Sequence, residues 1–302
     1  FVFKKPVEVM ENIDKVTEYI HAKQPQRTVL HFHHTPDRKI YLFDDNGFWR
    51  LFNYIPSSTY NTCSDLEVVR SAGEAFGEFQ MLLADFDAQQ LYVTIPNFHD
   101  TRKRYQKLLA DVAEDPMGMA AQVAEEVEWL KSVQQQACRL TDLYEAGQLP
   151  LRVTHNDTKI NNVLFQPNGN QAIVVIDLDT GHDFGDAIRF AANYVEEDSP
   201  EAEKAGVDME VFRAFTQGFL KHTAATLTQQ EVDTLALSCF ALTCELATRF
   251  LDDYILGSPY FKIQYPEHNL VRARCQIALA KDMLQKLDEM DAVVHQCMEQ
   301  YR

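Results

Sequence analysis

The chain has 302 residues, enough for two domains or one long enzyme fold, and 28 Lys plus Arg against 45 Asp plus Glu give it a formal net charge of −17. Such acidity repels the phosphates of nucleic acids and anionic membrane lipids, which argues against both as partners. Its six cysteines form no C-x-x-C pair and no apolar stretch approaches the length of about 18 residues typical of a membrane span, so we expect a cytoplasmic protein without disulfides or structural zinc.

The first part of the chain predicts one helix and three strands. Apolar residues recur every three or four positions over 6–22, which indicates an amphipathic helix. β-branched and aromatic residues then predict strands at 27–34, 40–43 and 48–55, with turn residues between them. The sequence Pro-Ser-Ser at 56–58 interrupts this pattern. We therefore predict a boundary there, with a small domain over 1–55 and a larger one over 56–302.

Helical periodicity dominates after this boundary. Ser64 and Glu67 fit a capping box that opens a helix reaching about residue 86. Further helices are predicted at 101–113, 117–146, 183–194, 209–226, 229–256 and 270–302. One exception is a pair of apolar runs, 162–166 and 172–176, joined by Asn-Gly, which is typical of a β-hairpin. A hairpin inside a helical domain can hold side chains rigidly at a cleft.

Candidate catalytic residues stand on both sides of this hairpin. Residues 155–162 fit the pattern H-x-D-x-K-x-x-N of kinase catalytic loops, and Asp177 follows the second strand. Phosphoryl transfer needs an aligned acceptor hydroxyl and a metal held by oxygen ligands. We therefore expect Asp157 to orient the hydroxyl and accept its proton, and Lys159 to place a cation beside the phosphoryl group. Asn162 and Asp177 would bind Mg²⁺.

Structural alternatives exist for these residue types. Single Asp and Asn residues in loops usually form turns or cap helices, and it is the joint order around the hairpin that favours catalysis. His155 is more typical of a structural brace for the loop than of a base. Asp186 is more typical of a helix cap that also steadies the catalytic loop.

Three strings of the sequence resemble the aminoglycoside phosphotransferase and choline kinase superfamily: THNDTKINNVLF at 154–165, VVIDLDT at 174–180 and DFGDAIRF at 183–190. Weaker strings, such as those at 98–101 and 249–251, are most similar to the N-acetylhexosamine 1-kinase group. The resemblance implies a bilobal protein-kinase-like α+β fold. It also implies ATP and Mg²⁺ as cofactors and transfer of the γ-phosphate to the anomeric hydroxyl of a sugar, N-acetylglucosamine or N-acetylgalactosamine.

The resemblance further implies roles for individual residues. Asp157 becomes the catalytic carboxylate, and Asn162 and Asp177 become the ligands of the metal and thereby of the nucleotide. Asp179 becomes either a second metal carboxylate or a support for the metal ligands.

Arg249 and Tyr260 are implied as contacts to the sugar. An arginine inside the apolar helix predicted around it is costly to bury unless it pairs or faces a cleft. The alternative to a sugar contact is an ion pair of Arg249 with Glu245 or Asp253, which lie four residues away on either side.

Two features depart from the family pattern. No glycine precedes Gly47, so no glycine-rich phosphate loop is present, and few residues separate the string at 174–180 from the one at 183–190. We expect the phosphate loop to lie upstream of Phe1, and residues to be missing from the sequence near 180–182.

Two other functions stay open. The acidity would suit phosphorylation of a cationic alcohol such as choline or an aminoglycoside. The chain could also be a nucleotide-independent binding protein that has kept the scaffold and lost its phosphate loop, although the intact motif argues against this. Carboxylates or bare aromatic faces in the acceptor pocket would favour a cation, whereas Arg249, Tyr260 and neutral hydrogen-bonding groups would favour a sugar.

Overall fold

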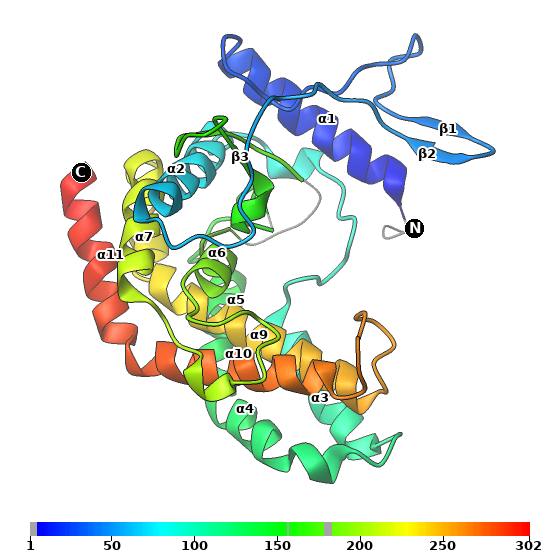
Figure 1. Ribbon diagram of the computed structural model, residues 1–302, viewed down its shortest axis with the longest axis vertical. Coiled ribbons are helices and arrows are strands. Elements are labelled where there is room, and N and C mark those ends of the chain that lie inside the picture. The colour runs from blue at the N-terminus through cyan, green and yellow to red at the C-terminus, as the bar shows by residue number, and fades with distance from the viewer. Residues whose placement is uncertain (1–4, 156, 178–182) are drawn as a thin grey trace.

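The computed structural model describes residues 5–155, 157–177 and 183–302, which form a mostly helical α+β fold with two separate two-stranded sheets (Figure 1). Asp179 and the expected gap at 180–182 lie outside the described residues. No helix within these ranges is long and apolar enough to cross a membrane.

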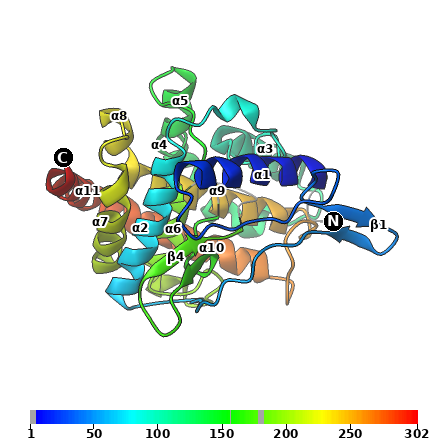
Figure 2. The ribbon, with the colours of Figure 1, turned by 90° about the horizontal axis from the view of Figure 1, so that it is seen from above.

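The N-terminal part contains helix α1 (Pro6–Lys23) and the strands β1 (Leu42–Asp44) and β2 (Gly47–Trp49). The two strands pair antiparallel and project away from the helices in both views (Figures 1 and 2). The predicted helix is confirmed, but the predicted strand at 27–34 is wrong. Only Phe32 pairs there, through a single bridge to Phe52. β-branched residues favour a strand only where a neighbouring strand offers a ladder, and the described residues provide none.

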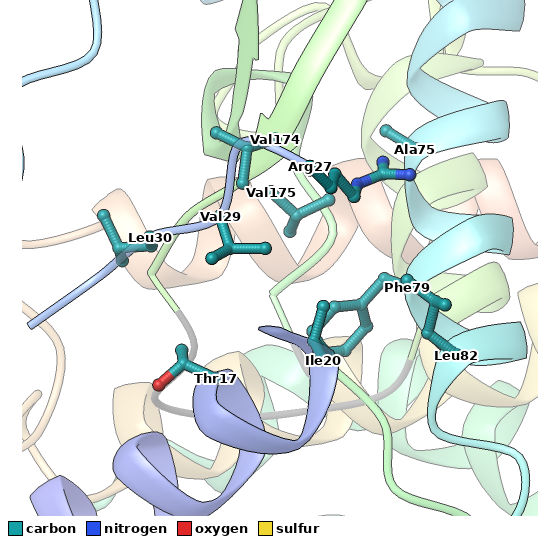
Figure 3. A pocket seen from close by; sticks show the side chains of 10 residues that line it. All are labelled: Thr17, Ile20, Arg27, Val29, Leu30, Ala75, Phe79, Leu82, Val174 and Val175. Atoms are coloured by element: carbon teal, nitrogen blue, oxygen red, sulfur yellow. The ribbon is translucent and has the colours of Figure 1, made fainter. Parts of the chain in front are cut away.

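Helix α1 contributes to two hydrophobic clusters. Val9 and Ile13 belong to a small cluster together with Leu30, whereas Val16 and Ile20 join the main core. Where α1 and the segment after it meet the following helix and the second hairpin, a cavity of only about 30 Å³ is left (Figure 3). That volume is about the share of one liquid water molecule, so this apolar gap is a packing feature and no ligand site.

The rest of the chain is helical apart from one hairpin. Its helices are α2 (Leu66–Leu82), α3 (Thr101–Glu114), α4 (Ala124–Ala137), α5 (Arg139–Glu145), α6 (Asp183–Ala191), α7 (Met209–Thr223), α8 (Gln229–Val232), α9 (Leu235–Ile255), α10 (His268–Gln285) and α11 (Leu287–Tyr301). Short 3₁₀ turns occur at Ala88–Gln90, Ala120–Val123, Ile160–Asn162 and Ala202–Lys204.

Most predicted helices are present, but the longest ones are interrupted. The segment 117–146 breaks at Cys138, 229–256 breaks after Val232, and 270–302 breaks at Lys286. The apolar period continues across each break because both pieces pack on the same core, so periodicity alone could not locate the bend. The predicted capping box of α2 is also wrong, since the side chain of Asp65 caps this helix by accepting from the backbone N–H of Glu67.

Helices α2 and α7 pack unusually close together. A Cβ atom added at Gly218 of α7 would lie 2.0 Å from the carbonyl oxygen of Arg70, and one at Gly77 of α2 would lie 2.4 Å from that of Phe219. Both glycines are helical, so their role is to permit backbone contact and not a special backbone angle. Helices α2 and α7 therefore form a tightly packed layer behind the second hairpin.

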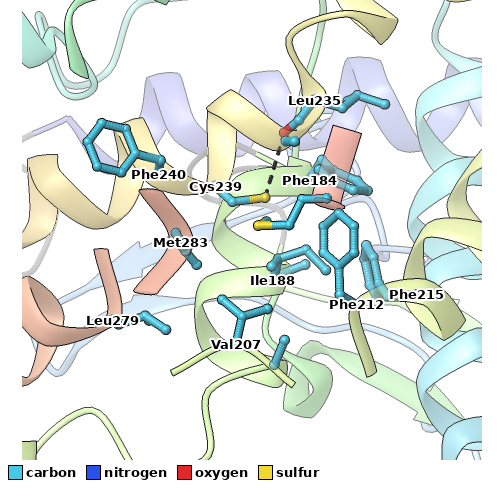
Figure 4. Packing of buried hydrophobic residues seen from close by; sticks show 14 of the residues in the cluster. Phe184, Ile188, Val207, Phe212, Phe215, Leu235, Cys239, Phe240, Leu279 and Met283 are labelled. Atoms are coloured by element: carbon cyan, nitrogen blue, oxygen red, sulfur yellow. Dashed lines mark hydrogen bonds between the residues drawn. The ribbon is translucent and has the colours of Figure 1, made fainter. Parts of the chain in front are cut away.

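The predicted hairpin is confirmed as β3 (Val163–Phe165) and β4 (Ala172–Val175), paired antiparallel with Val163 opposite Val175. Helix α6, which follows it, is anchored in the core. Phe184 and Ile188 pack among residues of α7, α9 and α10, including Phe212, Cys239 and Met283 (Figure 4). The hairpin and α6 therefore hold the residues around them in place.

Candidate active site

His155 braces the segment that precedes the hairpin. It is almost fully buried, with Nε2 2.8 Å from the carbonyl oxygen of Ile176 and Nδ1 accepting from the backbone N–H of Asp157 at 3.3 Å. Burial lowers the pKa of His155. These contacts fit a neutral ring that donates from Nε2, and they join the catalytic loop to the end of β4. The predicted brace is confirmed.

Asp157, Lys159 and Asn162 lie together in this loop. Lys159 Nζ is 2.9 Å from Oδ1 of Asp157 and donates to Oδ2 at 3.3 Å. The Asn162 side chain is only 8 % exposed, and its Nδ2 donates to the carbonyl oxygen of Asp157 at 2.8 Å. One cation and one amide thus fix both the side chain and the backbone of Asp157.

Asp177 stands directly beside this group along the hairpin. The backbone N–H of Ile176 donates to the carbonyl oxygen of Asn162 at 2.9 Å, so the residue after Ile176 emerges next to Asn162. Asp177 has φ +66°, a left-handed conformation that is uncommon for a non-glycine residue and that concentrates at functional sites. Its exposed carboxylate makes no hydrogen bond or ion pair with any described residue.

The chemistry of Asn162 and Asp177 fits a magnesium ion. Because Nδ2 of Asn162 is committed to the carbonyl of Asp157, Oδ1 is the atom that remains for a metal. Together with the Asp177 carboxylate it offers two hard oxygen donors, and Mg²⁺ commonly takes one or two protein ligands and completes its shell with phosphate oxygens and water. Among the described residues, no group of three or more His, Cys, Asp or Glu side chains could hold a metal.

Asp186 and Arg189 of α6 support the loop from below. Oδ2 of Asp186 accepts from the backbone N–H of Thr158 at 3.2 Å, while Oδ1 accepts from Nη2 of Arg189 at 2.9 Å. Arg189, 4 % exposed, also donates to Glu197 at 2.5 Å. Burial lowers the pKa of Arg189, but the two carboxylates outweigh that effect and raise it. The steadying role predicted for Asp186 is confirmed, whereas the capping role is wrong because this residue lies inside the first turn of α6.

A cavity of about 580 Å³ opens beside Asp157 and Lys159. It is bounded by the catalytic loop, α6, α9, α10, the loop before α3 and the segment between α9 and α10. Its volume falls in the range of small-molecule sites, about 300–1,000 Å³. Asn161, which also lines it, has a buried Oδ1 without a hydrogen-bond partner in the described part of the chain.

Arg249 lies in the wall of this cavity between two aromatic rings. Its guanidinium carbon is 5.0 Å from the ring centroid of Phe98 and 5.4 Å from that of Phe261. Burial and the neighbouring charge of Arg104 lower the pKa of Arg249, and the charge of Glu245 and the interaction with Tyr260 oppose them only in part. Tyr260 is 69 % exposed and lies outside the set of cavity-lining residues, so the two predicted sugar contacts differ in depth.

The alternative ion pairs of Arg249 are absent from the described residues. Glu245 lies 2.8 Å from His99 Nδ1 and accepts from the Thr101 hydroxyl at 2.7 Å. Asp253 accepts from the backbone N–H groups of Tyr260 and Phe261, at 2.9 and 3.0 Å. Both carboxylates are therefore engaged in shaping the cavity wall.

Several cavity residues were not predicted from the sequence. Arg189 stands in the string at 183–190 and could have been found with it, since an arginine in the apolar helix there needs a buried partner. Glu197, Lys262 and Arg272 carry no local signal. They reach the cavity only through the tertiary packing of segments far apart in the sequence.

Comparison with known proteins gives a family match. Residues 4–207 match the sequence model described as the phosphotransferase enzyme family. Of the solved structures, an aminoglycoside phosphotransferase from Alicyclobacillus acidocaldarius superposes with a TM-score of 0.61 at 14 % identity, covering 96 % of this chain and 84 % of that one.

Two further solved structures share this architecture. The ethanolamine kinase of Plasmodium vivax gives a TM-score of 0.51 at 14 % identity, covering 87 % of this chain and 70 % of that one. The choline kinase of Cryptosporidium parvum gives 0.51 at 11 % identity, covering 95 % and 81 %. These superpositions establish the bilobal kinase-like fold. At identities this low they establish nothing about the acceptor.

Proposed function

Since the chain belongs to the phosphotransferase enzyme family and is a small-molecule phosphotransferase, we propose that it transfers the γ-phosphate of ATP to the anomeric hydroxyl of an N-acetylhexosamine. Asp157 holds the acceptor hydroxyl and takes its proton, while Lys159 presents a cation where the phosphoryl group arrives. Asn162 and Asp177 would hold Mg²⁺, which neutralises charge on the phosphates when bound. Residues 1–55 are proposed to belong to the nucleotide-binding lobe.

The pairing of the aromatic rings and carboxylates in the cavity wall favours a sugar over a cationic alcohol as the acceptor. Aromatic faces could in principle bind a quaternary ammonium group, but the ring faces of Phe98 and Phe261 already meet the guanidinium of Arg249. The cavity carboxylates are engaged as well: Asp157 by Lys159, and Asp186 by Arg189. A cationic acceptor would therefore meet a cation where it needs an anion or a bare ring.

A coupled assay of ADP release over N-acetylglucosamine, N-acetylgalactosamine, glucosamine, choline and kanamycin tests this proposal. We expect turnover with the N-acetylated sugars. Turnover confined to choline or kanamycin would contradict it. Calorimetry with Mg·ATP separates an enzyme from a nucleotide-independent binding protein, because the latter would release no heat and show no thermal shift.

A further inference from the structure

Three half-buried arginines lie in or next to the cavity wall: Arg249 and Arg272 line it, and Arg104 lies beside Arg249. None of them has a carboxylate partner within the described ranges. Arg104 donates to the carbonyl oxygen of Phe98 at 2.8 Å. Arg272 donates to the carbonyl oxygen of Lys262 and to Oδ1 of Asn269, each at 3.2 Å. These acceptors are neutral, so they satisfy N–H groups without neutralising the charges.

The cavity carboxylates compensate for these arginines only in part, because the charge of Glu245 acts on Arg249 without forming an ion pair with it among the described residues. Asp186 and Glu197 bind Arg189, and Glu245 is held by His99 and Thr101. In a chain of net charge −17, counter-charges for three arginines would be easy to supply from the protein. Half-buried cations that lack them repel one another and lose hydration, which is unfavourable unless a ligand brings the missing charge.

The aromatic rings lie against two of these guanidinium groups and leave some of their N–H groups available. Arg249 stacks with Phe98 and Phe261, and Arg272 lies over Phe250 at 5.4 Å from its centroid. Stacking covers the flat faces of a guanidinium, whereas its N–H groups point outward in the plane. Nη1 of Arg272 already donates to Lys262 and Asn269, so Nη2 of Arg272 and the N–H groups of Arg249 are the donors that remain for the oxygens of a carboxylate or phosphate.

We propose that Arg249 and Arg272 form an anion subsite of the acceptor cavity, so that the preferred acceptor is a sugar carrying a carboxylate or a phosphate ester in addition to the hydroxyl that is phosphorylated. Lys262, which also lines this part of the cavity, adds a third cation at its rim. This inference rests on the proposed function and narrows its substrate class.

Kinetics with matched acceptors test the subsite. N-acetylglucosamine is the neutral acceptor, N-acetylmuramic acid adds a carboxylate, and N-acetylglucosamine 6-phosphate adds a phosphate. We expect kcat/KM at least about tenfold higher for one of the anionic sugars than for the neutral one. Arg272→Gln should reduce this preference by about tenfold or more, mainly through KM. Arg272→Lys should fall between the two because it keeps the charge but loses the planar guanidinium with its several N–H donors.

The control is Arg274→Gln, two residues along the same helix. Arg274 is exposed, pairs with Glu126 and lies outside the cavity, so its loss should leave the preference unchanged. Equal kcat/KM for neutral and anionic sugars, or an equal loss for all acceptors in Arg272→Gln, would refute the subsite while the proposed sugar kinase stands. Turnover of choline or kanamycin alone would refute the proposed function itself.

A binding measurement keeps the two results separate. Without ATP, anionic sugars should raise the melting temperature of the wild-type protein more than neutral ones, and Arg272→Gln should abolish the difference. Such a shift would support the subsite even for a sugar that is not phosphorylated. The same melting temperature with anionic and neutral sugars would overturn it.

Discussion

The catalytic loop differs in its charge pairing from the part of the cavity wall that contains Arg249 and Arg272, here called the arginine wall. In the loop each charge that holds the backbone has a partner: Lys159 pairs with Asp157, and Asp186 pairs with Arg189. In the wall, Arg249 and Arg272 are held by aromatic faces and neutral oxygens. Paired charges build a rigid frame, whereas stacked and unpaired charges keep their binding capacity for a ligand. The exposed carboxylate of Asp177, which has no partner among the described residues, follows the second pattern inside the first region.

The largest effect is expected for Asp157→Asn. The amide keeps the shape of the loop but cannot take the proton of the acceptor, so turnover should fall by about 10²–10⁴-fold with little change in the affinity for Mg·ATP. ADP release and calorimetry measure the two quantities. Asp45→Asn, in the exposed turn between β1 and β2, is the matched control. Wild-type turnover in Asp157→Asn would refute the catalytic role.

Breaking the ion pairs of Arg189 under the catalytic loop should lower the free energy of unfolding more than any substitution in the arginine wall. Arg189→Met removes one buried cation and leaves Asp186 and Glu197 unpaired, which should reduce the free energy of unfolding by about 3–5 kcal/mol in a urea titration. Arg274→Met, which removes the half-exposed arginine of an ion pair between α10 and Glu126 of α4, should change it by at most about 1 kcal/mol. Similar losses in both variants would show that the ion pairs of Arg189 stabilise the fold no more than the ion pair of Arg274 does.

Asp177→Asn probes the unpartnered carboxylate. It should weaken Mg²⁺-dependent binding of ATP by at least about tenfold, since even supporting residues at metal sites have effects of this size. Because the exposed carboxylate of Asp177 makes no hydrogen bond or ion pair with the described residues, the free energy of unfolding should hardly change. Unaltered nucleotide affinity, measured by calorimetry with and without Mg²⁺, would show that Asp177 is no metal ligand.

The smallest effect concerns pH. Burial lowers the pKa of His155 in the folded protein, while in the unfolded chain this side chain titrates near its ordinary value of about 6.5. As the pH falls below that value the unfolded state gains a proton that the folded state refuses, so stability is present above about pH 6.5 and declines below it. Urea titrations at several pH values should show a shallower decline in His155→Gln. His33→Gln, at an exposed site, should leave the decline as it is; identical profiles in all three proteins would contradict this account.

Local sequence signals predicted the frame well. The Asn-Gly pair located the hairpin, and the order of residues 155–162 located the loop, because both features are formed by neighbours in the chain. The strand at 27–34 failed since a strand depends on a partner that composition does not reveal. The predictions of long, uninterrupted helices were wrong at the breaks, because the apolar period continues across each break.

The arginine wall could not be predicted in this way. Arg249 was singled out through the family resemblance and through the cost of burying an arginine in an apolar helix, and Arg272 was missed. Whether an arginine is paired depends on which side chains of distant helices meet, and the candidate partners of Arg249 at four-residue spacing proved to be engaged elsewhere. Spacing along one helix shows which pairs are possible, and tertiary packing decides which of them form.

The backbone contact between α2 and α7 limits how this sequence can vary. No side chain larger than hydrogen fits at Gly218 or Gly77 unless one helix shifts against the other. Both positions should therefore tolerate almost no substitution, as strictly as the residues of the catalytic loop, although neither takes part in chemistry. A mutational scan of this chain would find them intolerant for steric reasons alone, and their intolerance should not be mistaken for a second site.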